Sequence, residues 1–254
     1  MIIVTAVKVV PEDQDIQVNA DRTLDYSKAH AVVSTYDLNA IEASAQAAKK
    51  AGAKHFAVCV GPASINDSKN NKNILARGVD ELFMAADDKF ADMDAKATAA
   101  ALAEAIKGIE GVDLIVCGDG SADLYAQQTD VQLACALGLP VVTAASAIEL
   151  ADGKAVVTRT LENETEVVEV PLPAVISVLP DIALPRIAGM RDIMMAGKKP
   201  VHQLALADAA KGVEVIETLA PVPAPRKKIV LDASADGAID QFVAAIAECI
   251  REEE

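Results

Sequence analysis

Residues 112–130, "VDLIVCGDGSADLYAQQTD", place an apolar run directly before a loop of glycines and small polar side chains. The apolar run is typical of a buried strand. The polar loop behind it is either an ordinary surface turn or a place where the protein holds a ligand. Repetition of the strand pattern along the chain decides the fold, and the character of this loop decides much of the function.

An apolar run followed by a helical segment occurs four times in the first half of the chain. The runs are continuous, as expected for strands covered on both faces, and the helices carry caps such as Asp94 and Gly52. The strands are expected at 1–10, 55–61, 80–86 and 112–117, and the helices at 37–51, 64–77, 94–108 and from about 123 to Gly138. This alternation predicts an α/β fold with a doubly wound, mainly parallel sheet.

The pattern changes after Pro140. Short strands joined by turn signals predict a small antiparallel or mixed extension of the same sheet, at 141–150, 154–163, 165–171 and 174–180. An irregular segment then covers 182–200, a proline-punctuated tether covers 220–230, and a helix is expected at about 236–251. A compact domain seldom needs so much irregular chain, so we expect a C-terminal tail that wraps a partner subunit.

Composition excludes several classes of protein. The net charge is −15, from 23 basic and 38 acidic residues, which argues against nucleic-acid binding and against adhesion to anionic lipid. The four cysteines, Cys59, Cys117, Cys135 and Cys249, follow no metal spacing and are typical of a reducing compartment. No signal peptide and no stretch of about 20 apolar residues is visible, so a soluble, cytoplasmic protein without membrane insertion is expected.

Several turns of the predicted sheet converge on one edge. Ligands of open α/β sheets bind beyond the carboxyl ends of the strands, where the strand order reverses. Ala6 ends the first strand, the turn at 34–37 opens the first helix, Val60 ends the second strand, and the loop 118–129 ends the fourth. We therefore expect these segments to meet at one site.

The loop itself leaves two interpretations open. Gly118 and Gly120 let the backbone approach a ligand, Ser121 and Asp123 could cap the next helix, and a helix N-terminus can bind phosphate. However, the loop contains neither G-x-G-x-x-G nor a P-loop lysine, and Asp119 and Asp123 count against an anion. Physical argument alone favours neither a nucleotide site nor an ordinary turn.

The sequence resembles the electron-transfer flavoprotein beta subunit over nearly its whole length. Six segments in the family's order carry the resemblance: "AVKVVP" (6–11), "STYDLNAIEAS" (34–44), "VCVGP" (58–62), "RGVDELF" (77–83), "LIVCGDGSADLYAQQT" (114–129) and "LPAVISVLPDIALPRIAGMRDIMMAGKKP" (172–200). The segment "DLYAQQ" is similar to the Fix-type branch. The resemblance implies an adenine-nucleotide alpha-hydrolase-like fold.

The resemblance also implies a function. Such a chain forms a heterodimer with an alpha subunit that binds FAD, and the pair carries electrons between acyl-CoA dehydrogenase-type flavoenzymes and other redox partners. The beta subunit holds AMP in one branch and a second FAD in the electron-bifurcating branch. No catalytic triad or acid–base pair is visible, so the chain is expected to be an electron-carrier subunit rather than a self-sufficient catalyst.

Family positions imply the site residues and a division of the chain. The cofactor contacts are Ala6, Ser34, Thr35, Tyr36, Asp37, Val60, Gly118, Asp119, Gly120, Ser121, Ala122, Asp123, Leu124, Tyr125, Ala126, Gln127, Gln128 and Thr129. The residues that dock a dehydrogenase are Arg186, Met190, Ile193 and Met194. The regions are a nucleotide-binding α/β domain at 1–180, a recognition loop at 181–200, and a tether with a terminal helix, contacting the alpha subunit, at 201–254.

The sequence differs from the family pattern at three places, and two questions stay open: the role of the methionines near residue 190 and the function itself. The family's basic residue after the first loop glycine is Asp119 here, its second loop aspartate is Tyr125, and its Asn-Pro is Ser34-Thr35. The lost positive charge weakens the case for a pyrophosphate and hence for FAD. The methionines at 190, 194 and 195 are either core or docking residues. The alternative function is a nucleotide-binding module of the same superfamily with no electron-transfer role.

Overall fold

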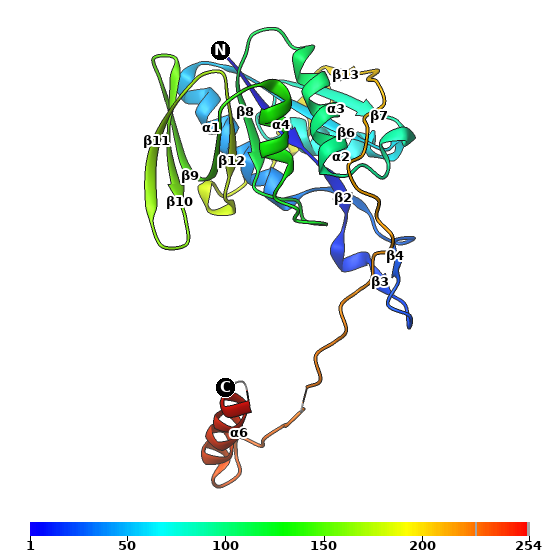
Figure 1. The fold of residues 1–254 in the computed structure, drawn as a ribbon, viewed down its shortest axis with the longest axis vertical. Helices are drawn as coiled ribbons and strands as arrows, with labels where there is room; N and C mark the ends of the chain where they lie inside the picture. The colour runs from blue at the N-terminus through cyan, green and yellow to red at the C-terminus, as the bar shows by residue number, and fades with distance from the viewer. Residues whose placement is uncertain (227, 253–254) are drawn as a thin grey trace. The chain divides into compact units, whose positions relative to one another are not determined.

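The computed structural model describes residues 1–226 and 228–252, which form two compact units divided between Thr218 and Leu219. The first unit contains a nine-stranded sheet with the order β11-β10-β9-β12-β8-β1-β6-β7-β13 (Figure 1). Its parallel centre consists of β12 (Ala174–Val178), β8 (Val112–Gly118), β1 (Ile2–Val7), β6 (Lys54–Gly61) and β7 (Glu81–Ala86).

Further strands extend the two edges of this sheet. Beside β12, β9 (Val141–Ala151) runs parallel, and β10 (Lys154–Thr160) and β11 (Thr165–Pro171) follow as an antiparallel ladder. Beside β7, β13 (Val201–Gln203) pairs in parallel. The predicted α/β fold, with a mainly parallel sheet and a small antiparallel extension, is therefore confirmed.

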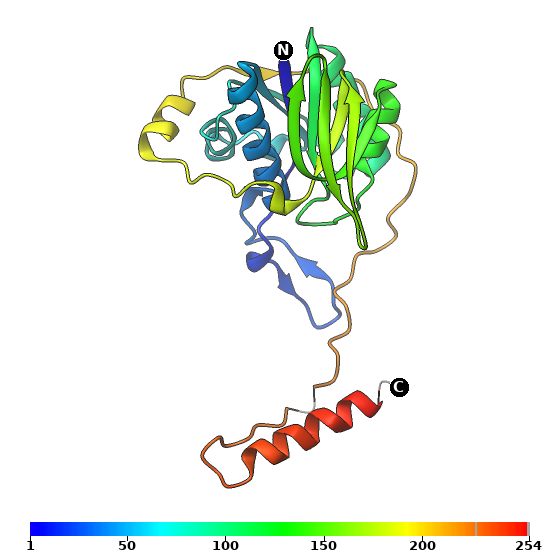
Figure 2. The same ribbon diagram turned by 90° about the vertical axis from the view of Figure 1, so that its left-hand side faces the viewer.

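Helices cover both faces of the sheet, as Figure 2 shows. On one face, α1 (Thr35–Ala51) packs against β1 and β8, and α2 (Ser68–Leu75) packs near β7. On the other face, α3 (Ala95–Lys107) and α4 (Thr129–Leu137) pack against each other, with α3 on β6 and α4 on β12. The fold thus has three layers, as two-sided burial of the apolar strands requires.

Local sequence explains where these helices begin and end. The Asp94 side chain accepts a hydrogen bond from the Ala97 amide at 2.8 Å, which satisfies one of the unpaired donors of the first turn of α3. Gly52 ends α1 with φ of 62°, a left-handed conformation that glycine adopts without strain. Both caps were predicted from the sequence.

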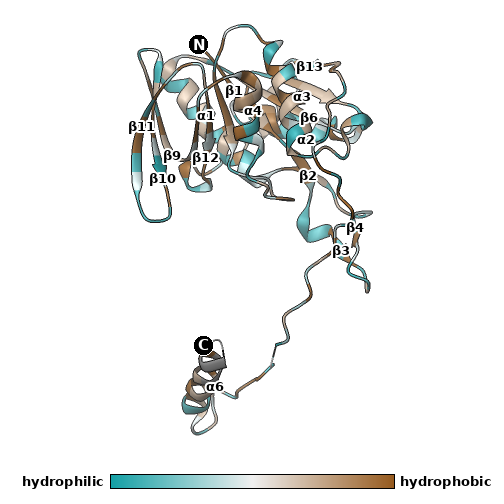
Figure 3. Cartoon of the chain, viewed as in Figure 1, coloured by the Kyte–Doolittle hydropathy of each residue, from teal (hydrophilic) through white to brown (hydrophobic). Residues whose placement is uncertain are grey.

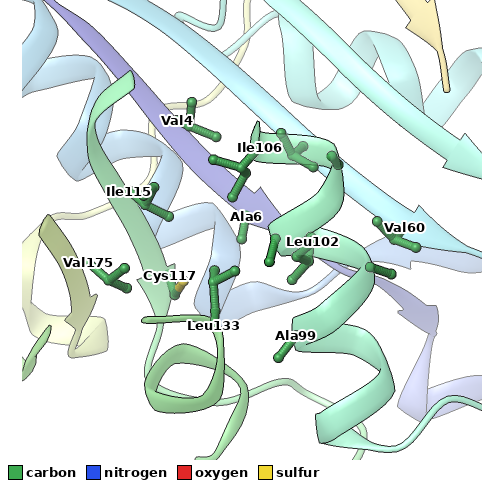
Figure 4. Close-up of a cluster of buried hydrophobic side chains, with 14 of the residues drawn as sticks. Val4, Ala6, Val60, Ala99, Leu102, Ile106, Ile115, Cys117, Leu133 and Val175 are labelled. Atoms are coloured by element: carbon green, nitrogen blue, oxygen red, sulfur yellow. The ribbon is translucent and has the colours of Figure 1, made fainter. Parts of the chain in front are cut away.

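The core consists mostly of small aliphatic side chains. Figure 4 shows one cluster, in which Leu102 and Ile106 of α3 and Leu133 of α4 meet Val4, Ile115 and Val175 of the sheet. Buried alanines along α3 let this helix approach the strands closely. Figure 3 shows the same division by hydropathy, with apolar central strands and a more polar β10–β11 edge. The low aromatic content therefore reflects tight packing of small residues.

Some elements were not predicted. The expected strand 1–10 is divided at Lys8 into β1 and β2 (Val9–Pro11), and β2 pairs with β5 (Ala31–Val33). A two-stranded hairpin of β3 (Gln17–Val18) and β4 (Leu24–Asp25) lies between them. The segment expected to be irregular contains a helix, α5 (Met190–Ala196), followed by β13. Short 3-10 helices occur at Asp13–Asp15, Ala63–Ile65, Asp88–Phe90 and Pro180–Ile182.

The second unit contains the predicted terminal helix, α6 (Ala238–Glu252). Phe242, Ala245, Ile246 and Ile250 of this helix border an apolar hollow shared with the stretch 229–231. Ile239, Val243 and Ile250 remain exposed, so the helix presents more apolar surface than this unit covers. Residue 227 of the expected tether and the side chain of Cys249 lie outside the described parts. Among the described residues, no helix is long and apolar enough to cross a membrane.

Truncation of Ile176 should measure how much the central strands contribute to stability. Ile176 lies in β12 between β8 and β9 and is fully buried, so Ile176→Ala should lower the free energy of unfolding by ~2–5 kcal/mol. The matched control is Val167→Ala on the exposed β11 edge, which should change it by less than ~0.5 kcal/mol. Urea denaturation measures both. Equal effects of the two substitutions would contradict the assigned core.

Candidate functional site

The strand order reverses between β1 and β8. From β1 the chain proceeds through β6 to β7 on one side of β1, and it then crosses to β8 on the other side, where β12 is the next strand in the sheet. After β1 the chain leads to α1 on one face, and after β8 it leads to α4 on the other, so a crevice opens between the two strand ends. A pocket lies there, with about 780 Å³ of empty space when its open mouth is included.

Asp37 joins the two strand ends beneath this pocket. It lies in the first turn of α1, and its Oδ2 accepts a hydrogen bond of 2.7 Å from the Lys8 backbone amide just after β1. The Gly118 backbone at the end of β8 also hydrogen-bonds to this carboxylate. Gly118 has to be glycine, because a Cβ there would lie 2.9 Å from Asp37 Oδ1. Burial raises the pKa of Asp37 to about 7, against the opposing effect of these hydrogen bonds.

The first part of the loop after β8 is tied to β1 by a lysine. Lys8 Nζ lies 2.8 and 2.6 Å from the two Asp123 oxygens and 3.5 Å from Ser121 Oγ. Burial alone would raise the pKa of Asp123, but the bonds from Lys8 and Ser121 outweigh it and lower the pKa. The Ala122 amide donates to Ser34 Oγ at 3.3 Å. These contacts hold the loop across the entrance to α1.

The prediction of a helix from about residue 123, capped by Ser121 or Asp123, is wrong. α4 begins at Thr129, because Ser121 and Asp123 bind Lys8 and because Tyr125 and Gln127 have φ of 44° and 53°, which interrupts a right-handed helix. Gln128 occupies the N-cap position, and no side chain caps the helix there. The first amides of α4, at Thr129 and Asp130 in the pocket lining, therefore have no acceptor from an N-cap side chain.

Tyr125 covers the loop glycine. Its ring packs so closely on Gly120 that a Cβ at this position would overlap the ring. The Tyr125 hydroxyl donates to Asp119 Oδ2 at 2.7 Å, and this hydrogen bond raises the pKa of Tyr125 to about 12. The centroid of the Tyr125 ring lies 5.0 Å from the centroid of the Tyr36 ring. The loop is thus an ordered structure rather than a simple turn.

The structure brings most of the predicted site residues together. Those that line the pocket are Ala6, Asp37, Val60, Gly118, Asp119, Gly120, Ser121, Leu124, Ala126, Gln127, Gln128 and Thr129. Six others lie beside it without lining it, namely Ser34, Thr35, Tyr36, Ala122, Asp123 and Tyr125. Five of these six make the loop contacts described above, namely Ser34, Tyr36, Ala122, Asp123 and Tyr125.

Sequence reasoning missed the wall that α3 contributes. Met93, Asp94, Ala95, Thr98 and Leu102 line the pocket opposite the loop. Asp94 was predicted as a helix cap, and the third strand ends at the same sheet edge as the others. Applying the strand-end rule to the third strand would therefore have found this wall. Val7, Lys8, Cys117 and Asp130 also line the pocket and were not among the predicted site residues.

The pocket combines an apolar floor with a polar rim. Ala6, Val60 and Leu102 belong to the buried cluster of Figure 4 and also line the pocket. Among the described lining residues, Lys8 is the one basic side chain, whereas four are acidic, namely Asp37, Asp94, Asp119 and Asp130. A flat, largely neutral group suits the floor, while a small anion suits only the amides of α4.

A second candidate site is the segment from Leu184 to Met195. Leu184, Ile187 and Met190 are 90, 96 and 81% exposed, and Met194 and Met195 are also exposed, so the core alternative for these methionines is wrong. The segment is nevertheless anchored, because Arg186 Nε and Nη2 donate to the buried Glu42 of α1 at 2.6 and 3.0 Å. Asn39 of α1 donates to the Pro180 and Ala183 carbonyls at 2.8 Å. The segment therefore exposes apolar side chains to solvent while its contacts with α1 hold it in place.

The fold is that of an open α/β protein with a pocket at the switch point of its sheet, the place where proteins of this class bind their ligands. Residues 22–209 match the family model of the electron transfer flavoprotein domain. This match covers most of the chain, which therefore belongs to the electron transfer flavoprotein domain family. Membership supports an electron-transfer role of the flavoprotein type.

The pH dependence of stability should reveal the buried Asp37. Its native pKa of about 7 is above the ordinary 3.8, so the folded state binds this proton more tightly, and the stability that the proton contributes is lost as pH rises toward about 7. Asp37→Asn has no such proton. The unfolding free energy of the native chain relative to the variant should therefore fall by ~2 kcal/mol between about pH 5.5 and about pH 8.

Urea denaturation at these two pH values measures the difference. His55 is also buried, and its pKa is lowered to about 4 by burial, but it is present in both proteins and cancels in the comparison. Parallel pH curves for the native chain and Asp37→Asn would show that Asp37 has an ordinary pKa in the folded state.

Proposed function

We propose that this chain is the beta subunit of an electron-transfer flavoprotein and, within that family, of the Fix-type branch. With an alpha subunit it carries electrons between acyl-CoA dehydrogenase-type flavoenzymes and other redox partners. Its own pocket holds an adenine nucleotide, AMP or a second FAD. The observation that carries the proposal is the pocket between the ends of β1 and β8, in a chain that belongs to the family.

The residues present fit an adenine nucleotide. The apolar floor of Ala6, Val60 and Leu102 suits a planar base, and the uncapped amides at Thr129 suit a phosphate. A flavin in this pocket would add one- and two-electron redox chemistry, whereas AMP would add none. The loop residues hold and orient the nucleotide, and Asp37 keeps the two sides of its pocket in register.

Two apolar surfaces support the proposed partners. The exposed segment with Leu184, Ile187 and Met190 suits a dehydrogenase, since flexible and polarisable side chains adapt to a partner surface. The exposed apolar side chains of α6 suit the alpha subunit, because their helical spacing forms a stripe along one face.

Nucleotide content tests the proposed pocket. The chain is co-expressed with an alpha subunit, the complex is denatured, and the FAD and AMP released per complex are quantified by chromatography. We expect one adenine nucleotide beyond the flavin of the alpha subunit. Two FAD would identify a redox flavin in this pocket, and one FAD with one AMP would identify a structural nucleotide. Recovery of the alpha-subunit flavin alone would contradict the proposal.

A matched pair of loop variants should locate this nucleotide. Ala126 lines the pocket and Ala122 does not, although both are exposed residues of the same loop. Ala126→Trp should therefore empty the pocket while Ala122→Trp retains the nucleotide, as measured by the same release assay. Equal occupancy in the two variants would place the nucleotide elsewhere.

A charge placed in the docking segment should slow electron transfer. Met190→Glu puts a carboxylate into an exposed apolar surface, and we expect at least a ~10-fold lower rate with an acyl-CoA dehydrogenase, because burial of an unpaired charge at an interface is costly. Val167→Glu on β11 is the control, since Val167 is equally apolar and also exposed. Stopped-flow flavin reduction measures the rate. Equal rates for both variants would remove the docking role from this segment.

A further inference from the structure

Asp119 has a carboxylate oxygen that the folded chain leaves without a partner. The residue is only 6% exposed and lines the pocket directly after β8. Its Oδ2 accepts the hydroxyl of Tyr125 at 2.7 Å. Its Oδ1 is buried and has no hydrogen-bond partner among the described residues. Buried polar atoms in folded proteins are nearly always hydrogen-bonded, so this one calls for a donor from outside the chain.

The surrounding residues do not supply that donor. Lys8 is the basic side chain of the pocket lining, but its ammonium group is bound to both oxygens of Asp123. The backbone amide of Asp119 donates to the Val178 carbonyl at 3.1 Å, which is part of the sheet edge. Tyr125 occupies the other carboxylate oxygen and blocks that side by packing on Gly120. None of these neighbours therefore donates to Oδ1, although Asp119 itself belongs to the pocket lining.

The chemistry of a carboxylate restricts what can occupy this position. An ionised carboxylate only accepts hydrogen bonds, and a phosphate has only acceptor oxygens near neutral pH, so the two repel each other. A ribose hydroxyl or an N–H of the base carries the required proton and no negative charge. Hydrogen bonds to a charged acceptor are among the stronger ones in proteins.

We propose that Asp119 Oδ1 accepts a hydrogen bond from the nucleoside part of the bound nucleotide, from a ribose hydroxyl or the adenine amino group, and so selects ligands that carry this donor. The inference rests on the proposed nucleotide-binding function. It assigns a specificity-determining role to Asp119, and it directs the phosphate away from Asp119 toward the uncapped amides of α4.

Nucleotide analogues that lack single donors test this assignment on the full-length chain. Isothermal titration calorimetry compares AMP with 2′-deoxy-AMP, 3′-deoxy-AMP and IMP, which lack the 2′ hydroxyl, the 3′ hydroxyl and the amino group respectively. One of the three should bind ~10- to 100-fold more weakly than AMP, and its identity names the donor. In Asp119→Ala, that analogue and AMP should bind within about threefold of each other.

Two further variants separate this role from a structural one. Asp119→Leu removes the acceptors but keeps the number and branching of the side-chain heavy atoms, so it should lose the same discrimination even where Ala disturbs the loop. Asp152→Asn, in the turn between β9 and β10, removes one negative charge at a distant position of the sheet, and asparagine tolerates the φ of 46° found there. This variant should therefore discriminate between the nucleotides like the native chain.

The outcomes distinguish the inference from the function it rests on. Tight AMP binding with equal affinity for all three analogues would overturn the role of Asp119 and leave the nucleotide site intact. Discrimination that persists in both Asp119 variants would overturn it as well. Absence of binding of AMP and all its analogues would instead overturn the proposed nucleotide site itself.

Discussion

The carboxylate of Asp37 is the interaction on which the site depends. The strands β1 and β8 are neighbours whose residues pair as far as Thr5 and Val116, and beyond this pair the chain leaves them toward helices on opposite faces of the sheet. Asp37 accepts hydrogen bonds from the backbone of Lys8, just past β1, and of Gly118, the last residue of β8. Because its side chain is buried among them, these amides stay paired while the crevice above remains open. The cost of burying this acid appears as its raised pKa.

The pocket above Asp37 separates two kinds of surface. Its floor is continuous with the hydrophobic core through Ala6, Val60 and Leu102, whereas its rim carries Lys8 and several carboxyl groups. Lys8 is already paired with Asp123, so it contributes little net positive charge to a bound anion. Binding of an anion in this pocket would therefore depend on the amides of α4, whose partial charges are fixed in direction and need no reorganisation. Such a pocket favours a nucleoside with few phosphate groups over a highly charged ligand.

Much of the fold could be predicted from local sequence, and much of the site could not. Apolar runs, Gly52 and Asp94 indicate strands and helix ends because each acts on its own neighbours. The loop after β8 is different. Ser121 and Asp123 are good helix caps in isolation, but Lys8, more than a hundred residues earlier, binds them instead. The brief β13 likewise forms only because its partner β7 offers a free edge. Long-range contacts of this kind leave no periodic signal.

A single helix connects the two candidate surfaces of the first unit. Asp37 in the first turn of α1 fixes the pocket, and Glu42, five residues later, binds Arg186 of the docking segment. At 1.5 Å per residue these two anchors lie only about 7–8 Å apart along the helix axis. Asn39 between them holds the Pro180 and Ala183 carbonyls. A buried helix cannot shift one anchor without the other, so the pocket and the docking segment keep a constant separation. Under the proposed function, this constant separation would hold a partner docked on the segment at a reproducible distance from a nucleotide in the pocket.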